Sequence, residues 1–103
     1  MVVVIYSTID DFKKAKEIAN TLVKEKLAAC VNIIPKMHSI YRWKGKIESS
    51  NECIIIAKTV DKNIKQIIKK IKSLHTYELP DIIVFPVIDG LKKYIEYIEN
   101  ETL

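Results

Sequence analysis

The side chains best suited to chemistry form two groups of potential metal ligands. His75 and Glu78 lie in one polar segment ahead of Pro80, whereas Met37 and Cys53 lie on two segments with alternating polar and apolar residues. Imidazole with soft sulfur ligands suits copper, and imidazole with carboxylate suits zinc or copper. These side chains could supply a site for copper or zinc, although no CxxC, HxH or HxxxH ligand spacing occurs. A structural role for His75 as a loop anchor is equally open at this point.

Catalytic motifs find little support in this chain. Only two glycines occur, and both fit turns, so no glycine-rich phosphate loop is present. The adjacent carboxylates Asp10 and Asp11 are explained by capping of a following helix. Cys30 is expected in a buried strand with no histidine placed beside it, which indicates a structural cysteine. We expect a protein that is not an enzyme.

The net charge of +4 and pI near 9.0 raise the question of a nucleic-acid partner. Arginine, the preferred reader of phosphate and guanine, occurs only once, as Arg42. The lysine excess falls on one predicted helix, which is typical of a solvated helix face. No nucleic-acid partner is expected. The lysines concerned are Lys62, Lys65, Lys69, Lys70 and Lys72.

The longest predicted element is a β-hairpin that turns at Gly45. Polar and apolar residues alternate on both sides of this glycine. The first arm, residues 28–43, would span roughly 50 Å at about 3.3 Å per residue. A domain of this size is only roughly 35 Å across, so the hairpin projects or bends at Pro35. Its edge, with Tyr41 and Trp43, needs a partner, and we predict an obligate oligomer with both aromatics at its interface.

Those two aromatic residues have a second interpretation, as a base-stacking platform of the kind used by RNA-recognition domains. The arginine and glycine pattern that accompanies such platforms is missing here. Burial at a subunit interface is the favoured interpretation.

The two cysteines are expected to stay unpaired. With the turn centred on Gly45, Cys53 lies opposite Met37, and Cys30 lies opposite Val60. The thiols would then be about 23 Å apart, whereas a disulfide needs α-carbons within about 7 Å. Free thiols fit a reducing compartment. The short apolar start lacks the features of a signal peptide, and no apolar run approaches the ~20 residues of a membrane span, so we predict a cytoplasmic protein without one.

The remaining elements position these side chains. The pattern predicts a buried strand at 2–7, a helix at 12–26, the hairpin, a helix from 59–61 to 74, a loop at 75–80, a strand at 82–85 and a final helix. This order, βαββαβ plus a C-terminal helix, predicts an α+β ferredoxin-like fold in one domain, with both central helices on one face of a mixed sheet. The predicted core stripe of the first helix is Phe12, Ala15, Ala19, Leu22 and Val23.

Several motifs resemble those of one family, the CutA divalent-cation tolerance proteins. The combination EKLAACVN, SIYRWKGKI and LHTYELPDII matches this family in order, spacing and total length. The resemblance covers nearly the whole chain and identifies 1–103 as a single CutA-like domain. It implies a ferredoxin-like subunit in a tight homotrimer whose hairpins pair between subunits. It also implies a link to tolerance of copper and other divalent cations, by binding rather than catalysis.

The resemblance bears on the metal ligands as well. Copper binders of the family can carry a cysteine at the end of the first strand and paired histidines in the loop. The corresponding places here are Tyr6 and Leu74-His75. If copper binds, the candidate ligands are His75 with Glu78 or a neighbouring subunit's group, and separately Cys53 with Met37.

A different function remains open as the alternative. P-II signalling proteins share the subunit fold and the trimer plan that the resemblance implies. A regulatory trimer of that kind would bind a small anionic ligand in the clefts between its subunits. The cations available for such a cleft are Lys58, Arg42 and Lys44.

Overall fold

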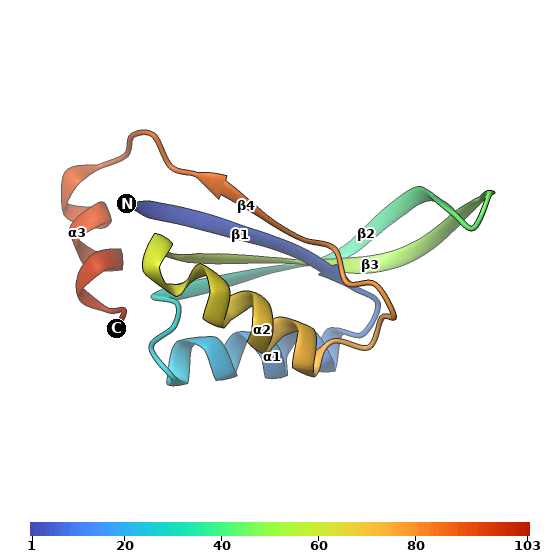
Figure 1. Cartoon of the computed structure of the whole chain (residues 1–103), viewed down its shortest axis with the longest axis horizontal. Helices are drawn as coiled ribbons and strands as arrows, with labels where there is room; N and C mark the ends of the chain where they lie inside the picture. The colour runs from blue at the N-terminus through green and yellow to red at the C-terminus, as the bar shows by residue number, and fades with distance from the viewer.

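The computed structural model describes all 103 residues and confirms the predicted order of elements (Figure 1). A four-stranded sheet in the order β2-β3-β1-β4 carries α1 and α2 on one face. The elements are β1 Val2–Ile9, α1 Phe12–Lys24, β2 Cys30–Trp43, β3 Lys46–Val60, the 3₁₀ turn Asp61–Asn63, α2 Ile64–Leu74, β4 Ile82–Pro86 and α3 Lys92–Asn100. This is the α+β ferredoxin-like arrangement.

The sheet is fully antiparallel, so the prediction of a mixed sheet was wrong. Every neighbouring pair, β2 with β3, β3 with β1 and β1 with β4, runs antiparallel. The physical reason is that β3 inserts between β1 and β2, and β1 inserts between β3 and β4. The strands that run parallel are therefore never neighbours.

The core lies between the sheet and the two central helices. Its centre is formed by side chains with no exposed surface, among them Ile5 of β1, Ile55 of β3 and Ile67 of α2. Helix α1 begins after Asp11, whose carboxylate accepts a hydrogen bond from the Lys14 backbone N–H at 3.1 Å. This is the predicted capping role.

The buried stripe of α1 is rotated from the predicted one. Ala15, Ile18 and Leu22 are buried, whereas Phe12 is 47% and Val23 is 43% exposed. At about 100° per residue, Phe12 and Val23 lie roughly 60–80° from Ala15, on the side away from Ile18. Both side chains therefore fall at the margin of the packed face.

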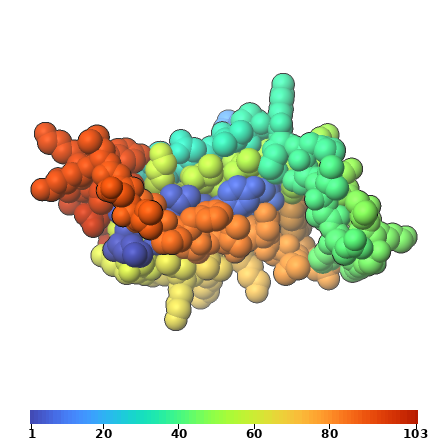
Figure 2. Space-filling view, turned by 90° about the horizontal axis from the view of Figure 1, so that it is seen from above, coloured from blue at the N-terminus to red at the C-terminus, as the bar shows by residue number.

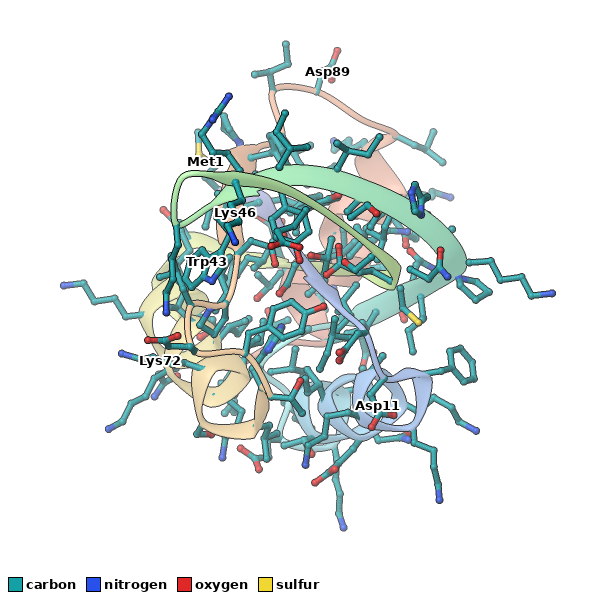
Figure 3. All side chains as sticks on the ribbon, turned by 90° about the vertical axis from the view of Figure 1, so that its right-hand side faces the viewer. Met1, Asp11, Trp43, Lys46, Lys72 and Asp89 are labelled. Carbon is teal, nitrogen blue, oxygen red and sulfur yellow. The ribbon has the colours of Figure 1, made fainter.

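The predicted lysine face of α2 is solvated, as expected. Figure 3 shows Lys72 at the edge of a layer from which charged side chains extend away from the sheet. Lys70 is the partial exception, because its ammonium lies 3.2 Å from the carboxylate of Glu25.

The hairpin projects from the body and bends, as predicted. β1 pairs with β3 only as far as Cys53, so the distal part of β3 has β2 as its only paired strand. The molecule measures 44 × 25 × 23 Å, with the hairpin at one end of the long axis (Figure 1). A bulge interrupts the β2–β3 pairing between Ile34 and Met37, and Lys36 within it has a φ of 61°.

This bulge and the turn correct the predicted register. Met37 pairs with Glu52 rather than Cys53, and Cys30 pairs with Lys58 rather than Val60. The turn is the two-residue Lys44-Gly45 with positive φ at both positions, as in a type I′ turn. Compared with the predicted register, this turn moves the partner of each β2 residue by one position. For the residues that precede the bulge, such as Cys30, the bulge moves the partner by one position more. Both cysteines are free thiols.

The sheet face opposite α1 and α2 lies open over most of its length (Figure 2). Helix α3 covers only one end, where Ile98 packs with Val2 and Val60. Elsewhere the face carries partly exposed apolar side chains, including Tyr6, Ile56 and Phe85. A large apolar sheet face without a cover is typical of a surface that binds another protein chain. No helix combines the length and apolar character needed to cross a membrane.

Candidate functional site

A pocket of about 570 Å³ lies where the distal hairpin faces the end of β1 and the loop before β4. Three separate parts of the chain contribute to its wall, and no lysine, arginine or histidine is among them. The lining residues are Tyr6, Thr8, Asp10, Ser39, Ile40, Tyr41, Trp43, Ser50, Glu52, Tyr77, Glu78, Leu79 and Asp81.

Four carboxylates give the pocket its electrostatic character. Asp10 follows β1, Glu52 lies on β3, and Glu78 and Asp81 lie in the loop before β4. Glu52 is only 7% exposed. A wall with four carboxylates and no basic side chain of its own favours a negative local potential, which attracts cations.

Hydrogen bonds fix two of these carboxylates. The Tyr77 hydroxyl donates a short hydrogen bond to Glu52. The Thr8 hydroxyl lies 2.7 Å from both carboxylate oxygens of Asp81, and the Thr8 backbone N–H donates to the same group at 3.3 Å. The carboxylates are thus held by β1 and by the loop, which is what a preorganised site requires.

His75 holds the loop in place through both ring nitrogens. Nε2 lies 2.7 Å from the Thr8 carbonyl, and Nδ1 lies 3.1 Å from the backbone N–H of Tyr77. Because a carbonyl only accepts and an N–H only donates, this network assigns the proton to Nε2. The His75 ring also packs on Tyr77, with centroids 4.6 Å apart. The arrangement is that of a loop anchor, the alternative that the sequence left open for this residue.

Tyr41 and Trp43, predicted at a subunit interface, line this pocket within the single chain. They occupy the same face of β2 because alternate residues of a strand point the same way. Tyr6 and Tyr77 complete an aromatic lining beside the carboxylates. The side chain of Trp43 is half-buried.

The structure does not bring Cys53 and Met37 together. Cys53 belongs to the core beneath the helices, whereas Met37 pairs with Glu52, whose side chain lies on the other face of the sheet. Burial, together with the nearby carboxylates of Asp11, Asp10 and Glu52, raises the pKa of the Cys53 thiol. A raised pKa disfavours the thiolate that a metal needs.

Within one chain, no three side chains of histidine, cysteine, aspartate or glutamate gather closely enough to hold a metal ion. The predicted pairing of His75 with Glu78 therefore lacks further ligands from its own chain. The prediction of a metal site at these residues remains a prediction that depends on groups from another subunit.

Of the three predicted anion-binding cations, Lys58 lies far from the other two, Arg42 and Lys44, which are both at the turn end of the hairpin. Lys58 is eleven residues of β3 away from Ile47, the register partner of Arg42, a separation of roughly 36 Å along a fully extended strand. Lys58 instead donates to the Tyr94 hydroxyl at 3.2 Å, and this hydrogen bond raises its pKa. Lys44 lies in the turn, with its ammonium 5.6 Å from the Trp43 ring.

Sequence reasoning missed the roles of Asp10, Glu52 and Asp81. Asp10 was assigned to helix capping, but Asp11 alone is the cap, and Asp10 accepts a bond from the Thr76 hydroxyl at 3.4 Å. No spacing signal links the three carboxylates, because they meet only through the register of the sheet and the position of the loop.

Replacing Tyr77 with phenylalanine is expected to lower the free energy of unfolding by about 1–3 kcal/mol, because the buried Glu52 loses its partner. Burial and the nearby carboxylates hold the pKa of Tyr77 well above its usual range. The protonated phenol therefore adds stability below the ordinary tyrosine pKa near 10, and this contribution is lost as the pH rises above that value.

The measurement is urea unfolding of the wild type and the variant at several pH values from neutral to strongly alkaline. The stability of the wild type should fall more steeply above about pH 10 than that of Tyr77→Phe. Tyr41→Phe is the matched control, since Tyr41 is exposed. Parallel curves for wild type and Tyr77→Phe would contradict the assignment.

Known proteins resemble this chain both in sequence and in structure. The family model described as "CutA1 divalent ion tolerance protein" matches residues 3–101. The divalent-cation tolerance protein CutA of Thermus thermophilus is 35% identical over 99 residues, covering 96% of each chain. A solved structure of a divalent cation tolerance protein, also from Thermus thermophilus, superimposes with a TM-score of 0.96 at 35% identity, covering 99% of both chains.

Plant relatives are similar over a shorter share of their own length. The chloroplastic protein CutA of Arabidopsis thaliana is 38% identical over 100 residues, which cover 97% of this chain and 55% of the relative. The chain thus spans just over half of the length of that protein, and a rice relative is covered to 56%.

Proposed function

Since the chain belongs to the family of CutA1 divalent ion tolerance proteins, we propose that it is a homotrimer that binds divalent cations and has no catalytic activity. Copper is the first ion to test, and zinc is the second. We also propose a cytoplasmic location, which the two free thiols support, because thiols stay reduced in that compartment.

The observation that carries the cation-binding proposal is the lining of the pocket. A chain with a net charge of +4 directs four carboxylates and no basic side chain into one cavity. Such a segregation of charge raises the local concentration of cations. It also argues against the alternative of a small anionic ligand at this place, because Lys58 lies outside the pocket and Arg42 lies at the far end of the hairpin.

The open sheet face supports the trimer. Its partly exposed apolar side chains include Ile34, Ile83 and Phe85, which are each about half exposed in the single chain. The long strand β2 also pairs on one side only, so its outer edge is free. An exposed edge of this length offers unpaired backbone groups to another chain, which fits hairpins that pair between subunits.

The trimer also supplies what the single chain lacks at the metal site. Glu78 is an exposed residue of the pocket wall, and His75 Nδ1 accepts only one hydrogen bond, from a backbone N–H at 3.1 Å. Among divalent ions of the first transition row, Cu²⁺ binds such ligands most tightly. It is therefore the ion best able to displace the Tyr77 N–H from His75 Nδ1. We propose that Glu78 and His75 of one subunit bind the ion together with a neighbouring subunit's side chain.

The test is a calorimetric titration of Cu²⁺, buffered by a competing chelator, into the assembled protein. We expect saturation at a whole-number ratio per chain, and an affinity at least about tenfold weaker, or about 1.4 kcal/mol, in Glu78→Gln. Glu96→Gln, in an exposed turn of α3, is the control and should bind like the wild type. Non-saturable binding, or equal affinity in both variants, would overturn the proposed site.

A further inference from the structure

We infer that the outer face of the helix layer binds the surface of an anionic lipid bilayer through its lysine ammonium groups. The helix layer comprises residues 11–26 and 61–74, which contain α1 and α2, and it covers the sheet face opposite to the open one (Figure 1). The proposed trimer covers the open face, so the outer side of the helix layer stays accessible in the assembled protein. Nothing in this interaction depends on the proposed metal site.

Positive charge is concentrated in the helix layer. The layer holds ten lysines and four carboxylates, a net charge of +6, whereas the rest of the chain has seven basic and nine acidic side chains. Each of the four carboxylates already accepts a hydrogen bond or an ion pair from within the chain. Only Lys14 and Lys70 among the ten lysines form ion pairs. The other eight ammonium groups remain available to an external anion.

The exposed lysines of α1 form a single stripe. At about 100° per residue, Lys13, Lys16 and Lys24 fall within roughly 80° of arc around the helix axis, and all three are exposed. The buried Ile18 and Leu22 lie on the opposite side of the helix. The lysine stripe of α1 therefore faces away from the sheet.

Helix α2 carries an equivalent stripe. Its exposed lysines Lys65, Lys69 and Lys72 fall within roughly 60° of arc, opposite the buried Ile67 and Ile71. Figure 3 shows nitrogen-tipped side chains that extend from both helices away from the sheet. Because α1 and α2 contact each other in one layer, the two stripes form one continuous basic face.

The shape of this basic face favours a flat partner over a grooved one. Two helices side by side are roughly 20 Å wide, since each is about 10–12 Å across with its side chains. A slab of that width does not enter the major groove of DNA, which is about 12 Å wide. On a planar bilayer, in contrast, both stripes contact lipid headgroups at the same time.

The residue type favours the same partner. Every basic side chain of the helix layer is a lysine, and a lysine ammonium is a hydrated point charge on a flexible stem. Such groups suit a diffuse layer of anionic headgroups, whereas arginine is the usual choice for phosphate contacts of fixed geometry. Each lysine close to an anionic membrane contributes about fivefold in affinity. Two stripes of three lysines are therefore enough for a strong preference for anionic over neutral bilayers.

The experiment is sedimentation of the assembled protein with lipid vesicles, in the presence of a chelator that removes metal. The vesicles consist of phosphatidylcholine alone or of phosphatidylcholine mixed with phosphatidylglycerol. We expect saturable binding to the mixed vesicles, at least about a hundredfold tighter than to the neutral ones. Added salt should weaken this binding, because salt screens exposed charges. Equal binding to both kinds of vesicle, or no binding to either, would overturn the inference.

Paired variants test whether the helix layer is the binding face. Lys65→Gln combined with Lys69→Gln removes two exposed charges from α2 and should weaken binding to the mixed vesicles at least about tenfold. Lys92→Gln combined with Lys93→Gln removes the same charge from exposed positions on α3 and should bind nearly as tightly as the wild type. Equal losses in the two double variants would mean that binding follows the total charge, and the assignment to the helix layer would be wrong.

A competition experiment separates a bilayer from a nucleic acid as the partner. Duplex DNA of mixed sequence is added to the vesicle-bound protein, at a phosphate concentration equal to that of the anionic lipid. We expect the protein to stay on the vesicles, because the basic face is too wide for the DNA groove. Transfer of the protein to the DNA would overturn the choice of a lipid surface and identify a nucleic acid as the partner of the helix layer.

Discussion

Replacing Ile56 with glutamate is expected to convert the proposed trimer into folded monomers. Ile56 lies on β3 between Tyr6 and Asn32 and points to the open face of the sheet. An unpaired carboxylate buried there against another subunit would cost about 3–5 kcal/mol. A loss of this size weakens each interface at least about a hundredfold. Within one chain the side chain is only partly buried, so the fold itself should survive.

Light scattering and sedimentation measure this outcome, with circular dichroism to confirm the fold. Ile88→Glu is the matched control, because Ile88 is 94% exposed in the segment that follows β4. That variant should keep the mass of the wild type. A trimer that persists in Ile56→Glu would show that the open sheet face is not the interface. If Ile56→Glu is monomeric, a Cu²⁺ titration of this variant tests whether metal binding needs neighbouring subunits.

Replacing Ile55 with alanine should have the opposite result, a large loss of stability without a specific effect on assembly. Ile55 is next to Ile56 on the same strand but faces the helices, where it has no exposed surface. Removing three buried carbon atoms leaves a cavity in a close-packed core, and such changes cost about 2–5 kcal/mol. For a domain of this size, that lowers the melting temperature by roughly 10–30 °C.

Chemical unfolding of Ile55→Ala, measured at several protein concentrations, gives this value. Ile55→Val is the graded control and should cost about 0.5–1.5 kcal/mol, since it removes one methyl group. Equal stability of the alanine variant and the wild type would mean that the space beside Ile55 collapses without cost. Together, the neighbouring substitutions at 55 and 56 separate folding from assembly on one strand.

Most of the fold could be predicted from the sequence because local patterns decide it. Alternation around Lys44-Gly45 specifies the hairpin, and Asp11 marks the start of α1 through its own capping bond. The loop at 75–80 follows from Pro80, which excludes the helical conformation at the preceding residue. The buried face of α1 was predicted less accurately, because a small rotation of the helix about its axis places Phe12 and Val23 at the margin of that face.

The site could be predicted only in part. Tyr41 and Trp43 were predicted at a subunit interface, which stays a prediction; within the single chain they line the pocket. Cys53 and Met37 were paired by a register centred on Gly45, but the two-residue turn Lys44-Gly45 pairs Met37 with Glu52 instead, which places the Met37 and Cys53 side chains on opposite faces of the sheet. The position of His75 was foreseen, but whether its ring nitrogens were free depended on contacts with Thr8 and the Tyr77 backbone.

The sequence by itself determined the order of the elements, the long hairpin and the family, because these depend on periodicity, turn residues and motifs that are contiguous in the chain. Only the tertiary structure decided the register and the pocket. Asp10, Glu52 and Asp81 are remote in sequence and gather because β1 pairs with β3 and the loop folds back onto Thr8. The physical reason is that a one-residue shift in strand register moves a side chain to the other face of the sheet. A register shift caused by a bulge cannot be recognised from the local sequence pattern.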